Sequence, residues 1–413
     1  MKLFKHQQDI INDNPKKCGI FLGTGSSKTR TALELAEGNI LVVAPKTQVS
    51  DKNWERENKK WSINKDLTVV SKEAFRRDYK SIPSYDTVIL DEAHTMTGVT
   101  TAIRWVKGKS QPKSSQIFDA LHYYLTLNPP KRLYVLTATP TRSAMCVYGI
   151  AKLLGVDINY YQFREDYYYK LNIPGRDIFT AKKDEQVKNK LSELVRSLGY
   201  VGRLQDYFDV PEQTYRNVYI ENTTDQKNRL KELPLEYPEP IVLLTKKLQV
   251  ENGILLGDEY NASETFSNGK IDAILGFAEE FPKIIIFARY IYQIEEIKKA
   301  LEKENKKVYT MTGGTKERGE LIAEVNKLDS YIFIVSAQIS AGWELPECPV
   351  MIFASMTYSI VDRIQGEGRI LRANALKKNL YITLITKGGV DEAVFKALEN
   401  KQDFNEKLYE GRS

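Results

Sequence analysis

The segment Gly23–Thr29, with the sequence Gly-Thr-Gly-Ser-Ser-Lys-Thr, carries residue types that could bind phosphate. It follows an apolar run and precedes a helix-like run, which is the strand–loop–helix context that a phosphate loop requires. Backbone N–H groups at a helix N-terminus point toward an anion, and the helix dipole favours its negative charge. In such a loop Lys28 would reach the β- and γ-phosphates of ATP, and Thr29 would ligate Mg²⁺.

One position departs from the common phosphate-loop pattern. That pattern has Gly directly before the Lys, whereas Ser27 stands there in this chain. A steric demand for Gly would weaken phosphate binding, and a Gly/Ser turn with a surface lysine remains the alternative interpretation. The predicted phosphate-binding residues are Gly23, Thr24, Gly25, Ser26, Ser27, Lys28 and Thr29.

A second group of reactive side chains, Asp91-Glu92-Ala93-His94, follows the apolar run 87–90. Parallel sheets place their reactive groups at the carboxyl ends of strands. Asp91 could hold Mg²⁺ through water there, and Glu92 could orient or deprotonate an attacking water. An acidic helix N-cap is the alternative interpretation, but a phosphate loop upstream in the same sheet favours ATP hydrolysis.

These groups need a scaffold, and near-continuous apolar runs indicate one. Such runs, separated by helical stretches, indicate strands of a parallel sheet that is covered on both faces. In the first third of the chain they are 19–22, 40–44, 67–70, 87–90 and 132–136. In the last third they are 283–287, 307–309, 331–335, 350–353 and 380–384. The sequence therefore predicts two α/β domains in tandem.

The middle of the chain differs from both ends. Residues 156–215 contain five tyrosines (160, 161, 167, 168 and 169) and a Lys-rich helical stretch, which we interpret as helical material between the domains. Prolines at 234, 238 and 240 interrupt the chain again before the second sheet. We therefore predict domains at 1–155 and 216–413, with an inter-lobe region at 156–215.

Composition limits the class of protein. A chain of 413 residues suits two domains, and 42% hydrophobic with 28% charged residues is typical of a globular protein. No apolar run is long enough to cross a bilayer, and the polar start, 1–10, has no signal-peptide core, so we expect a cytoplasmic protein. Three distant cysteines fit neither a disulfide framework nor a zinc site. A net charge of +6 permits binding to a polyanion without establishing it.

The Asp-Glu-Ala-His segment resembles the second motif of superfamily 2 helicases and translocases, and further motifs follow in the same order. Residues 3–7, Leu-Phe-Lys-His-Gln, resemble the short glutamine motif of that superfamily, in which the Gln, here Gln7, recognises adenine. Residues 137–140, Thr-Ala-Thr-Pro, resemble its third motif, which couples hydrolysis to DNA contact. The resemblance implies two RecA-like domains that share one ATP site.

Residues 365–372, Gln-Gly-Glu-Gly-Arg-Ile-Leu-Arg, resemble the sixth motif, Gln-x-x-Gly-Arg-x-x-Arg. In the superfamily its arginines face the phosphate loop from the second domain and stabilise the transition-state charge. The resemblance therefore implies catalytic roles for Gln365, Arg369 and Arg372. Spacing alone would favour ordinary surface arginines.

A narrower resemblance to Swi/Snf-type double-stranded DNA translocases extends over nearly the whole chain. It rests on three segments: Leu-Val-Val-Ala-Pro-Lys with Asn-Trp-Glu-Arg-Glu at 41–57, Tyr-Val-Gly-Arg with Asp-Val-Pro at 200–211, and Ser-Ala-Gly-Trp-Glu-Leu at 340–345. That family often has Gly where Trp343 stands here. The size of the chain is similar to that of compact motors encoded by bacteriophages.

The resemblance also implies a nucleic-acid track, because loops at strand ends grip one phosphate backbone in this family. Such contact is independent of sequence and sensitive to salt. The implied residues are Lys46, Thr47, Thr312, Gln338 and Ser340. The basic loop 107–113 and the tyrosines at 167–169 could also contact nucleic acid, but a solvated face and packing on the sheet edge are their simpler interpretations.

The predicted function is an ATP- and Mg²⁺-dependent motor on DNA, with duplex DNA as the expected partner and a recruiting protein as a further one. We expect a monomer. A strand-separating or branch-migrating helicase remains open, because the sixth motif fits both outputs. An ATP-dependent protein-binding switch or loader with little hydrolysis also remains open, because Ser27 favours it. A small-molecule phosphotransferase would leave the second sheet and its arginines unexplained.

Overall fold

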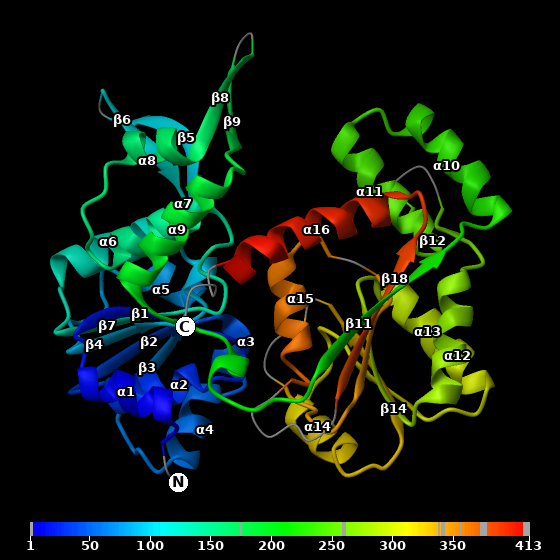
Figure 1. Cartoon of the computed structure of the whole chain (residues 1–413), viewed down its shortest axis with the longest axis horizontal. Helices are drawn as coiled ribbons and strands as arrows, with labels where there is room; N and C mark the ends of the chain where they lie inside the picture. Colours follow the sequence, from blue (N-terminus) through cyan, green and yellow to red (C-terminus); the bar gives the residue numbers. More distant parts are fainter. Residues whose placement is uncertain are drawn as a thin grey trace. The chain divides into compact units, whose positions relative to one another are not determined.

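A computed structural model describes residues 3–106, 108–173, 176–257, 262–337, 339, 343–355, 357–371 and 378–407 (Figure 1). The chain forms two compact units, one running to Phe208 and the other spanning Asp209–Gln402. Each unit is described below by itself.

Six parallel strands form the sheet of the first unit in the part of the chain that the structure describes. Their order across the sheet is β10-β1-β7-β4-β2-β3. Four of the five predicted strands match or nearly match observed ones in bounds, and the fifth, β1, begins two residues earlier than the predicted run. The strands are β1 (Lys17–Leu22), β2 (Ile40–Ala44), β3 (Leu67–Ser71), β4 (Thr87–Leu90), β7 (Arg132–Leu136) and β10 (Gly199–Gly202).

Helices cover both faces of this sheet, as continuous apolar strands require. One apolar layer includes Ile10, Leu33 and Trp54, from α1, α2 and α4. The opposite layer is formed with α5, α6, α7 and α9. The helices are α1 (Lys5–Asp13), α2 (Lys28–Leu35), α3 (Lys46–Ser50), α4 (Asn53–Lys60), α5 (Lys72–Asp78), α6 (Gln116–Leu127), α7 (Ala144–Leu153), α8 (Tyr160–Tyr167) and α9 (Glu185–Leu198).

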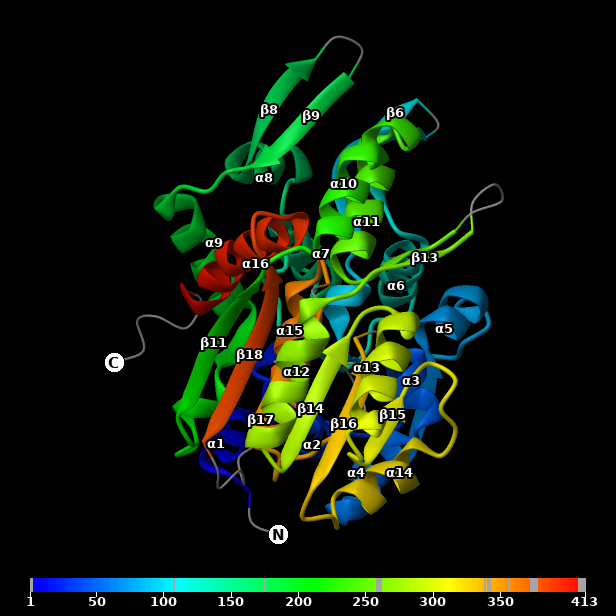
Figure 2. The same cartoon turned by 90° about the vertical axis from the view of Figure 1, so that its right-hand side faces the viewer.

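Two antiparallel hairpins extend the first unit beyond its sheet (Figures 1 and 2). The first is formed by β5 (Val99–Val106) and β6 (Lys109–Ser114), and the second by β8 (Tyr168–Ile173) and β9 (Arg176–Ala181). The region 156–215 thus contains helices α8 and α9, as expected, but also the second hairpin and β10. Its assignment as a separate inter-lobe region stays a prediction.

The second unit repeats the design, with six parallel described strands in the order β11-β18-β17-β14-β16-β15. All five predicted runs are strands, and β11 adds an edge that was not predicted. The strands are β11 (Gln213–Ile220), β14 (Lys283–Ala288), β15 (Val308–Met311), β16 (Tyr331–Ser336), β17 (Val350–Phe353) and β18 (Asn379–Thr386), with a small ladder of β12 (Ile254–Leu255) and β13 (Glu264–Thr265).

The second sheet is also covered on both faces, by α12 and α13 on one and by α14, α15 and α16 on the other. Its helices are α10 (Thr224–Glu236), α11 (Pro240–Glu251), α12 (Gly269–Glu280), α13 (Ile291–Lys303), α14 (Arg318–Val325), α15 (Ile360–Glu367) and α16 (Val390–Lys407). The fold class is therefore confirmed: two RecA-like parallel α/β domains in tandem. None of the described helices combines the length and apolarity that a bilayer crossing demands.

Candidate functional site

Three loops meet at the carboxyl edge of the first sheet because their strands are neighbours. Strand β7 lies between β1 and β4, and all three run parallel. The phosphate-loop segment follows β1, the Asp91–His94 segment follows β4, and the 137–140 segment follows β7. The sheet topology thus brings together three motifs that lie far apart in the sequence, at 23–29, 91–94 and 137–140.

The phosphate loop bends back over the end of β1 and delivers Lys28 to the first turn of α2. The Lys28 ammonium donates to the carbonyl oxygens of Leu22 at 2.9 Å and Gly23 at 3.2 Å, so it lies across the loop. The Ser26 hydroxyl is buried and has no hydrogen-bond partner among the described residues. A buried polar atom without a partner is costly unless a ligand completes it.

Ser27 is the N-cap of α2 and has a left-handed backbone, with φ 57° and ψ 39°. This region favours glycine, because a Cβ atom there approaches the following carbonyl oxygen. Gly25 has a positive φ as well, at 78°. The backbone at position 27 is therefore one that Gly adopts without strain, whereas Ser27 adopts it at a cost in free energy.

The Gln7 side chain packs onto the far end of this loop from α1. It is buried, and its amide Nε2 lies 3.5 Å from both the Ser27 carbonyl oxygen and Thr31 Oγ1. Contacts of this length are weak hydrogen bonds. Beside it, His6 Nε2 lies 3.2 Å from the Ser26 carbonyl oxygen, and burial lowers the pKa of His6. Gln7 thus adjoins the loop, and its role toward adenine stays a prediction.

Asp91 is buried at the end of β4 and accepts two hydrogen bonds. The Trp54 indole Nε1 donates to Oδ2 at 3.1 Å, and the backbone N–H of Glu92 donates to Oδ1 at 2.9 Å. Burial, with a smaller contribution from the Glu92 charge, raises the pKa of Asp91 to about 6, against the opposing effects of the Trp54 bond and the Lys28 charge. A carboxylate held in this way gains from a bound cation.

His94 joins the acidic segment to the 137–140 segment. Its Nδ1 lies 3.3 Å from Glu92 Oε2 and 2.9 Å from Thr137 Oγ1. The Thr137 hydroxyl oxygen also accepts the backbone N–H of Thr139 at 3.1 Å. One chain of contacts therefore runs from the predicted catalytic carboxylate, Glu92, to the loop after β7.

The residues of this edge fit Mg²⁺ and ATP. Mg²⁺ in nucleotide sites uses one or two carboxylates together with phosphates, and the described residues contain no larger cluster of His, Cys, Asp and Glu that could hold a metal alone. Asp91, directly after β4, and Thr29, in the first turn of α2, could supply the protein ligands. Bound Mg²⁺ would neutralise charge on the β- and γ-phosphate oxygens. The buried Ser26 hydroxyl and the Lys28 ammonium offer two further donors to phosphate.

The predicted track residues have mixed positions. Lys46 and Thr47 are exposed in α3, directly after the carboxyl end of β2. Thr312 follows β15 and is half-buried, and its backbone N–H donates to Thr315 Oγ1 at 2.9 Å. Gln338 and Ser340 lie outside the described residues.

The sixth-motif residues belong to the second unit, where α15 carries Gln365 and precedes Arg369. Gln365 is buried. The Arg369 guanidinium donates from Nε to the Gln365 carbonyl oxygen at 2.9 Å and from Nη1 to the Trp343 carbonyl oxygen at 3.0 Å. Arg369 would therefore have to give up these two hydrogen bonds within its own unit before its guanidinium could bind a nucleotide. Arg372 lies outside the described residues.

Trp343 is a core residue in this structure. It is buried, stacks on Phe287, and donates from Nε1 to the Ile339 carbonyl oxygen at 2.7 Å. Its bulk, in place of the Gly common in the resembling family, is accommodated by packing. Trp343 thereby supports the backbone carbonyl that holds Arg369.

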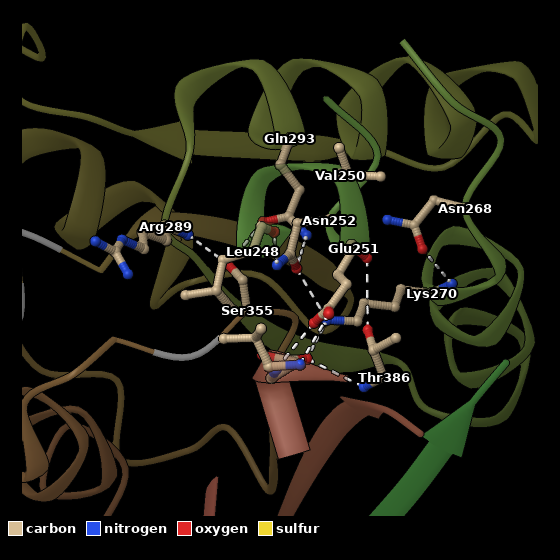
Figure 3. A network of polar contacts seen from close by, with 12 residues as sticks. Leu248, Val250, Glu251, Asn252, Asn268, Lys270, Arg289, Gln293, Ser355 and Thr386 are labelled. Atoms are coloured by element: carbon tan, nitrogen blue, oxygen red, sulfur yellow. Dashed lines mark hydrogen bonds and ion pairs between the residues drawn. The ribbon is translucent and has the colours of Figure 1, made fainter. Parts of the chain in front are cut away.

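Sequence reasoning missed Arg289, which follows β14 at the carboxyl edge of the second sheet. Its backbone N–H donates to Ser355 Oγ at 2.7 Å, while its side chain extends away from that contact (Figure 3). Guanidinium Nη1 is buried without a hydrogen-bond acceptor among the described residues, and the Tyr358 ring lies 4.7 Å away. In the sequence, Arg289 could have been noticed because it is an arginine that directly follows an apolar strand.

A buried polar network stands behind Arg289 and fixes this edge (Figure 3). Lys270 Nζ lies 2.6 Å from Asp391 Oδ2 and 2.9 Å from Asn252 Oδ1, and the Glu251 carboxylate accepts the backbone N–H of Asp391 at 2.9 Å. Gln293 Nε2 donates to Asn252 Oδ1 at 3.2 Å. The network ties α11, α12, α13 and α16 together, so the loops that they flank are held in place.

Comparisons with known proteins found a family match in the second unit and similar solved structures. Residues 269–374 match the family described as the helicase conserved C-terminal domain. Among solved structures, the SWI2/SNF2 ATPase core of Sulfolobus solfataricus in complex with double-stranded DNA is similar at 18% identity and a TM-score of 0.40, covering 99% of this chain and 93% of that chain. No curated protein matches the chain.

The family match covers strands β14, β15, β16 and β17 of the second sheet and extends to residue 374, so it includes the predicted sixth motif at 365–372. It indicates a helicase-type, nucleic-acid-dependent ATPase and confirms the prediction of that enzyme class. It leaves the roles of individual residues as predictions.

Proposed function

We propose that the chain is an ATP-driven translocase on double-stranded DNA, of the Swi/Snf type. The observation that carries the proposal is the convergence of the phosphate loop, the Asp91–Glu92 pair and Thr137 at one sheet edge, where His94 contacts both Glu92 and Thr137. Such a link suits a motor, because the carboxylate proposed to activate water, Glu92, lies next to a histidine that is hydrogen-bonded to the loop after β7. The family match of the second unit supports it further.

In this proposal each residue of the first unit has one task. Lys28 binds the β- and γ-phosphates, Thr29 and Asp91 hold Mg²⁺, and Glu92 orients the attacking water. Gln7 recognises adenine. Trp54 is a positioning residue, because its indole orients the Asp91 carboxylate.

The second unit contributes the charge that completes the site. Gln365, Arg369 and Arg372 meet the triphosphate when the two units close over it, and the arginines stabilise the transition-state charge. In this proposal Arg369 exchanges its present hydrogen bonds to the carbonyl oxygens of Gln365 and Trp343 for bonds to the triphosphate.

DNA binds through its phosphate backbone, which gives contact without sequence preference. Lys46, Thr47, Thr312, Gln338 and Ser340 are the proposed contacts. The preference for duplex DNA rests on the resemblance to Swi/Snf-type segments at 41–57, 200–211 and 340–345.

A second candidate is an ATP-dependent switch or loader that binds a partner protein and hydrolyses little ATP. The left-handed backbone of Ser27 favours it, because strain in the phosphate loop weakens the grip on the triphosphate. In that case DNA would leave the ATPase rate unchanged.

The test compares ATP turnover with duplex DNA, single-stranded DNA and RNA, with Lys28→Ala as the inactive control. The proposal expects the largest stimulation with duplex DNA. Displacement of a triplex-forming strand without separation of the duplex then identifies a translocase, whereas separation of the duplex identifies a helicase. Stimulation by none of the three nucleic acids would sink the proposal and favour the switch.

A further inference from the structure

The imidazole of His6 contacts both the phosphate loop and the segment at which the chain leaves the first unit. This segment, residues 203–208, follows β10 and ends at Phe208, after which the chain enters the second unit. We call it the exit segment. The phosphate loop and the exit segment are far apart in the sequence, so a side chain that contacts both connects the nucleotide site to the link between the units.

His6 is hydrogen-bonded to the phosphate loop. Its Nε2 lies 3.2 Å from the Ser26 carbonyl oxygen, and because a carbonyl oxygen can only accept, Nε2 carries the proton of the neutral ring. His6 is only 5% exposed, and burial lowers its pKa against the opposing effects of the Ser26 bond and the Asp9 charge. The imidazole is therefore a neutral donor to the loop near pH 7.

The same imidazole is covered by two rings of the exit segment. The Tyr207 ring stacks on it, with centroids 4.1 Å apart and an angle of 21° between the planes. The Phe208 ring meets it edge-on, at 5.7 Å and 82°, and Phe4 meets Phe208 edge-on at 4.7 Å. Stacked and edge-to-face pairs are the favourable arrangements of such rings. A displacement of the exit segment would break these contacts.

The two rings belong to one hydrogen-bonded turn. The backbone N–H groups of Tyr207 and Phe208 both donate to the Leu204 carbonyl oxygen, at 3.1 and 3.0 Å. The backbone N–H of Arg203 donates to Asp206 Oδ2 at 2.7 Å, which closes the start of the turn. Because the turn is closed in this way, contact with His6 at its two rings restrains the whole exit segment.

A backbone contact also joins the phosphate loop to the residue before the exit segment. The N–H of Gly23 donates to the Gly202 carbonyl oxygen at 2.8 Å, where Leu22 and Gly202 pair in the β1–β10 ladder. This contact holds residue 202 and does not involve the two rings. The route through Gly202 and the route through His6 can therefore be separated by a substitution at His6.

We propose that His6 is a positioning residue that couples a nucleotide in the phosphate loop to the exit segment. A triphosphate bound to the Ser26 hydroxyl and to the backbone N–H groups of the loop fixes the orientation of the Ser26 carbonyl group. The imidazole that donates to this carbonyl is fixed with it, and so are the rings of Tyr207 and Phe208. The inference rests on the proposed function, because it takes ATP as the ligand of the loop, and adds a regulation of that site.

Hydrogen–deuterium exchange of the full chain tests the coupling, with and without a saturating non-hydrolysable Mg²⁺-ATP analogue and in the absence of DNA. Exchange in peptides that cover 23–29 reports nucleotide in the phosphate loop. Exchange in peptides that cover 203–208 reports local opening of the exit segment.

The variants separate the two contacts of the imidazole. His6→Phe keeps a ring for Tyr207 but has no donor for Ser26, and His6→Gln keeps a donor but has no ring. Tyr207→Phe keeps the stacked ring, so it should behave as the wild type does. The matched control is His122→Phe, because the His122 ring stacks on Phe118 in α6, at 5.9 Å.

In the wild type, Tyr207→Phe and His122→Phe, the nucleotide should slow exchange in the exit segment by about 5- to 150-fold, the usual range of coupling between two sites. In His6→Phe and His6→Gln the nucleotide should still slow exchange at 23–29 but leave exchange in the exit segment unchanged. A merely structural role of His6 would raise exchange in the exit segment equally with and without nucleotide, and the slowing by nucleotide would remain.

Slowing of the exit segment by nucleotide in either His6 variant would overturn the inference. So would its absence in the wild type while exchange at 23–29 is slowed. Both outcomes leave the proposed function standing, because the loop still binds the nucleotide. No slowing at 23–29 in the wild type would overturn the inference together with the nucleotide site on which the proposed function depends.

Discussion

The imidazole Nδ1 of His94 lies 2.9 Å from the hydroxyl oxygen of Thr137, so the loop after β4 is bonded to the loop after β7. The same nitrogen lies 3.3 Å from Glu92 Oε2. A shift of the Thr137 segment would therefore move the imidazole and alter the setting of the Glu92 carboxylate. In a motor, this is a short route from a DNA-dependent movement to the activation of water.

Replacing Thr137 with Val should slow ATP hydrolysis without weakening ATP binding. The variant keeps the shape of the side chain but removes the oxygen that contacts His94. We expect kcat with saturating duplex DNA to fall about tenfold, which corresponds to about 1.4 kcal/mol of transition-state stabilisation. Steady-state kinetics measure this. Thr139→Val is the matched control, because the Thr139 hydroxyl has no hydrogen-bond partner in the described part of the chain. An equal fall in both variants would contradict the role of the His94 contact.

Binding of Mg²⁺-nucleotide should depend on pH through Asp91. Its pKa of about 6 means that a proton competes with Mg²⁺ for the carboxylate below that pH. The affinity for a non-hydrolysable Mg²⁺-ATP analogue should fall about tenfold per pH unit below about pH 6 and level off above it. Calorimetry across this range measures it. Asp91→Asn should bind more weakly and without this pH dependence, and an unchanged pH profile would contradict the assignment.

The Asp91 carboxyl group should also make the folding stability of the ligand-free protein depend on pH. This stability should fall as the pH rises, whereas nucleotide affinity should rise. The pKa of Asp91 is higher in the folded protein than its ordinary value of 3.8, so the folded state holds the proton more tightly than the unfolded state. The contribution of Asp91 to the folding stability of the ligand-free protein is favourable at low pH and is lost as the pH rises toward about 6. At neutral pH, Asp91→Asn should therefore raise the midpoint of urea unfolding of the ligand-free protein.

Ser27→Gly should stabilise the phosphate loop, because glycine adopts the left-handed backbone of Ser27 without strain. Relief of about 1–2 kcal/mol, less about 0.5–1 kcal/mol for the greater freedom of glycine in the unfolded chain, predicts a gain of about 0–1.5 kcal/mol. Urea unfolding measures it. Ser27→Ala keeps the strain and serves as the control. Equal stability of the two variants would show that the loop is not strained at Ser27.

Lys270→Met should destabilise the second unit strongly. It would leave the Asp391 carboxylate buried without the ammonium that lies 2.6 Å away, and such a loss costs about 3–5 kcal/mol. The control is Lys306→Met, which breaks a 2.8 Å pair with the exposed Glu279 and should cost less than about 1 kcal/mol. Urea unfolding of both variants decides the matter: similar losses would mean that the buried pair does not hold this edge together.

The sequence predicted most of both sheets because continuous apolar runs can be buried on both faces only inside a parallel sheet. The run 87–90 and the run 350–353 match β4 and β17 residue for residue. The edge strands β10 and β11 were missed, since Gly-Tyr-Val-Gly is short and every residue of β11 is exposed or only half-buried. The opposite edge strands, β3 and β15, were predicted, so the lack of an apolar run, and not the edge position, explains why β10 and β11 were missed.

The site was predicted in part for a related reason. Lys28, Asp91 and Glu92 stand out because they follow apolar strands in recognisable order. Trp54 does not, because its bond to Asp91 joins residues 37 positions apart and depends on how α4 packs against the sheet. The burial of Lys270 beside Asp391, 121 positions apart, is equally a product of tertiary packing.

In the proposed motor, Glu92 in the first unit and Arg369 in the second act on one ATP during movement on duplex DNA. The decisive experiment is steady-state ATP turnover, with and without duplex DNA, in the wild type, Glu92→Gln and Arg369→Ala. We expect the duplex to stimulate the wild type strongly and turnover to be reduced by about 10³–10⁵ in Arg369→Ala, with Glu92→Gln also inactive and DNA binding intact in both. Wild-type turnover by either variant would show that the two residues do not share one ATP.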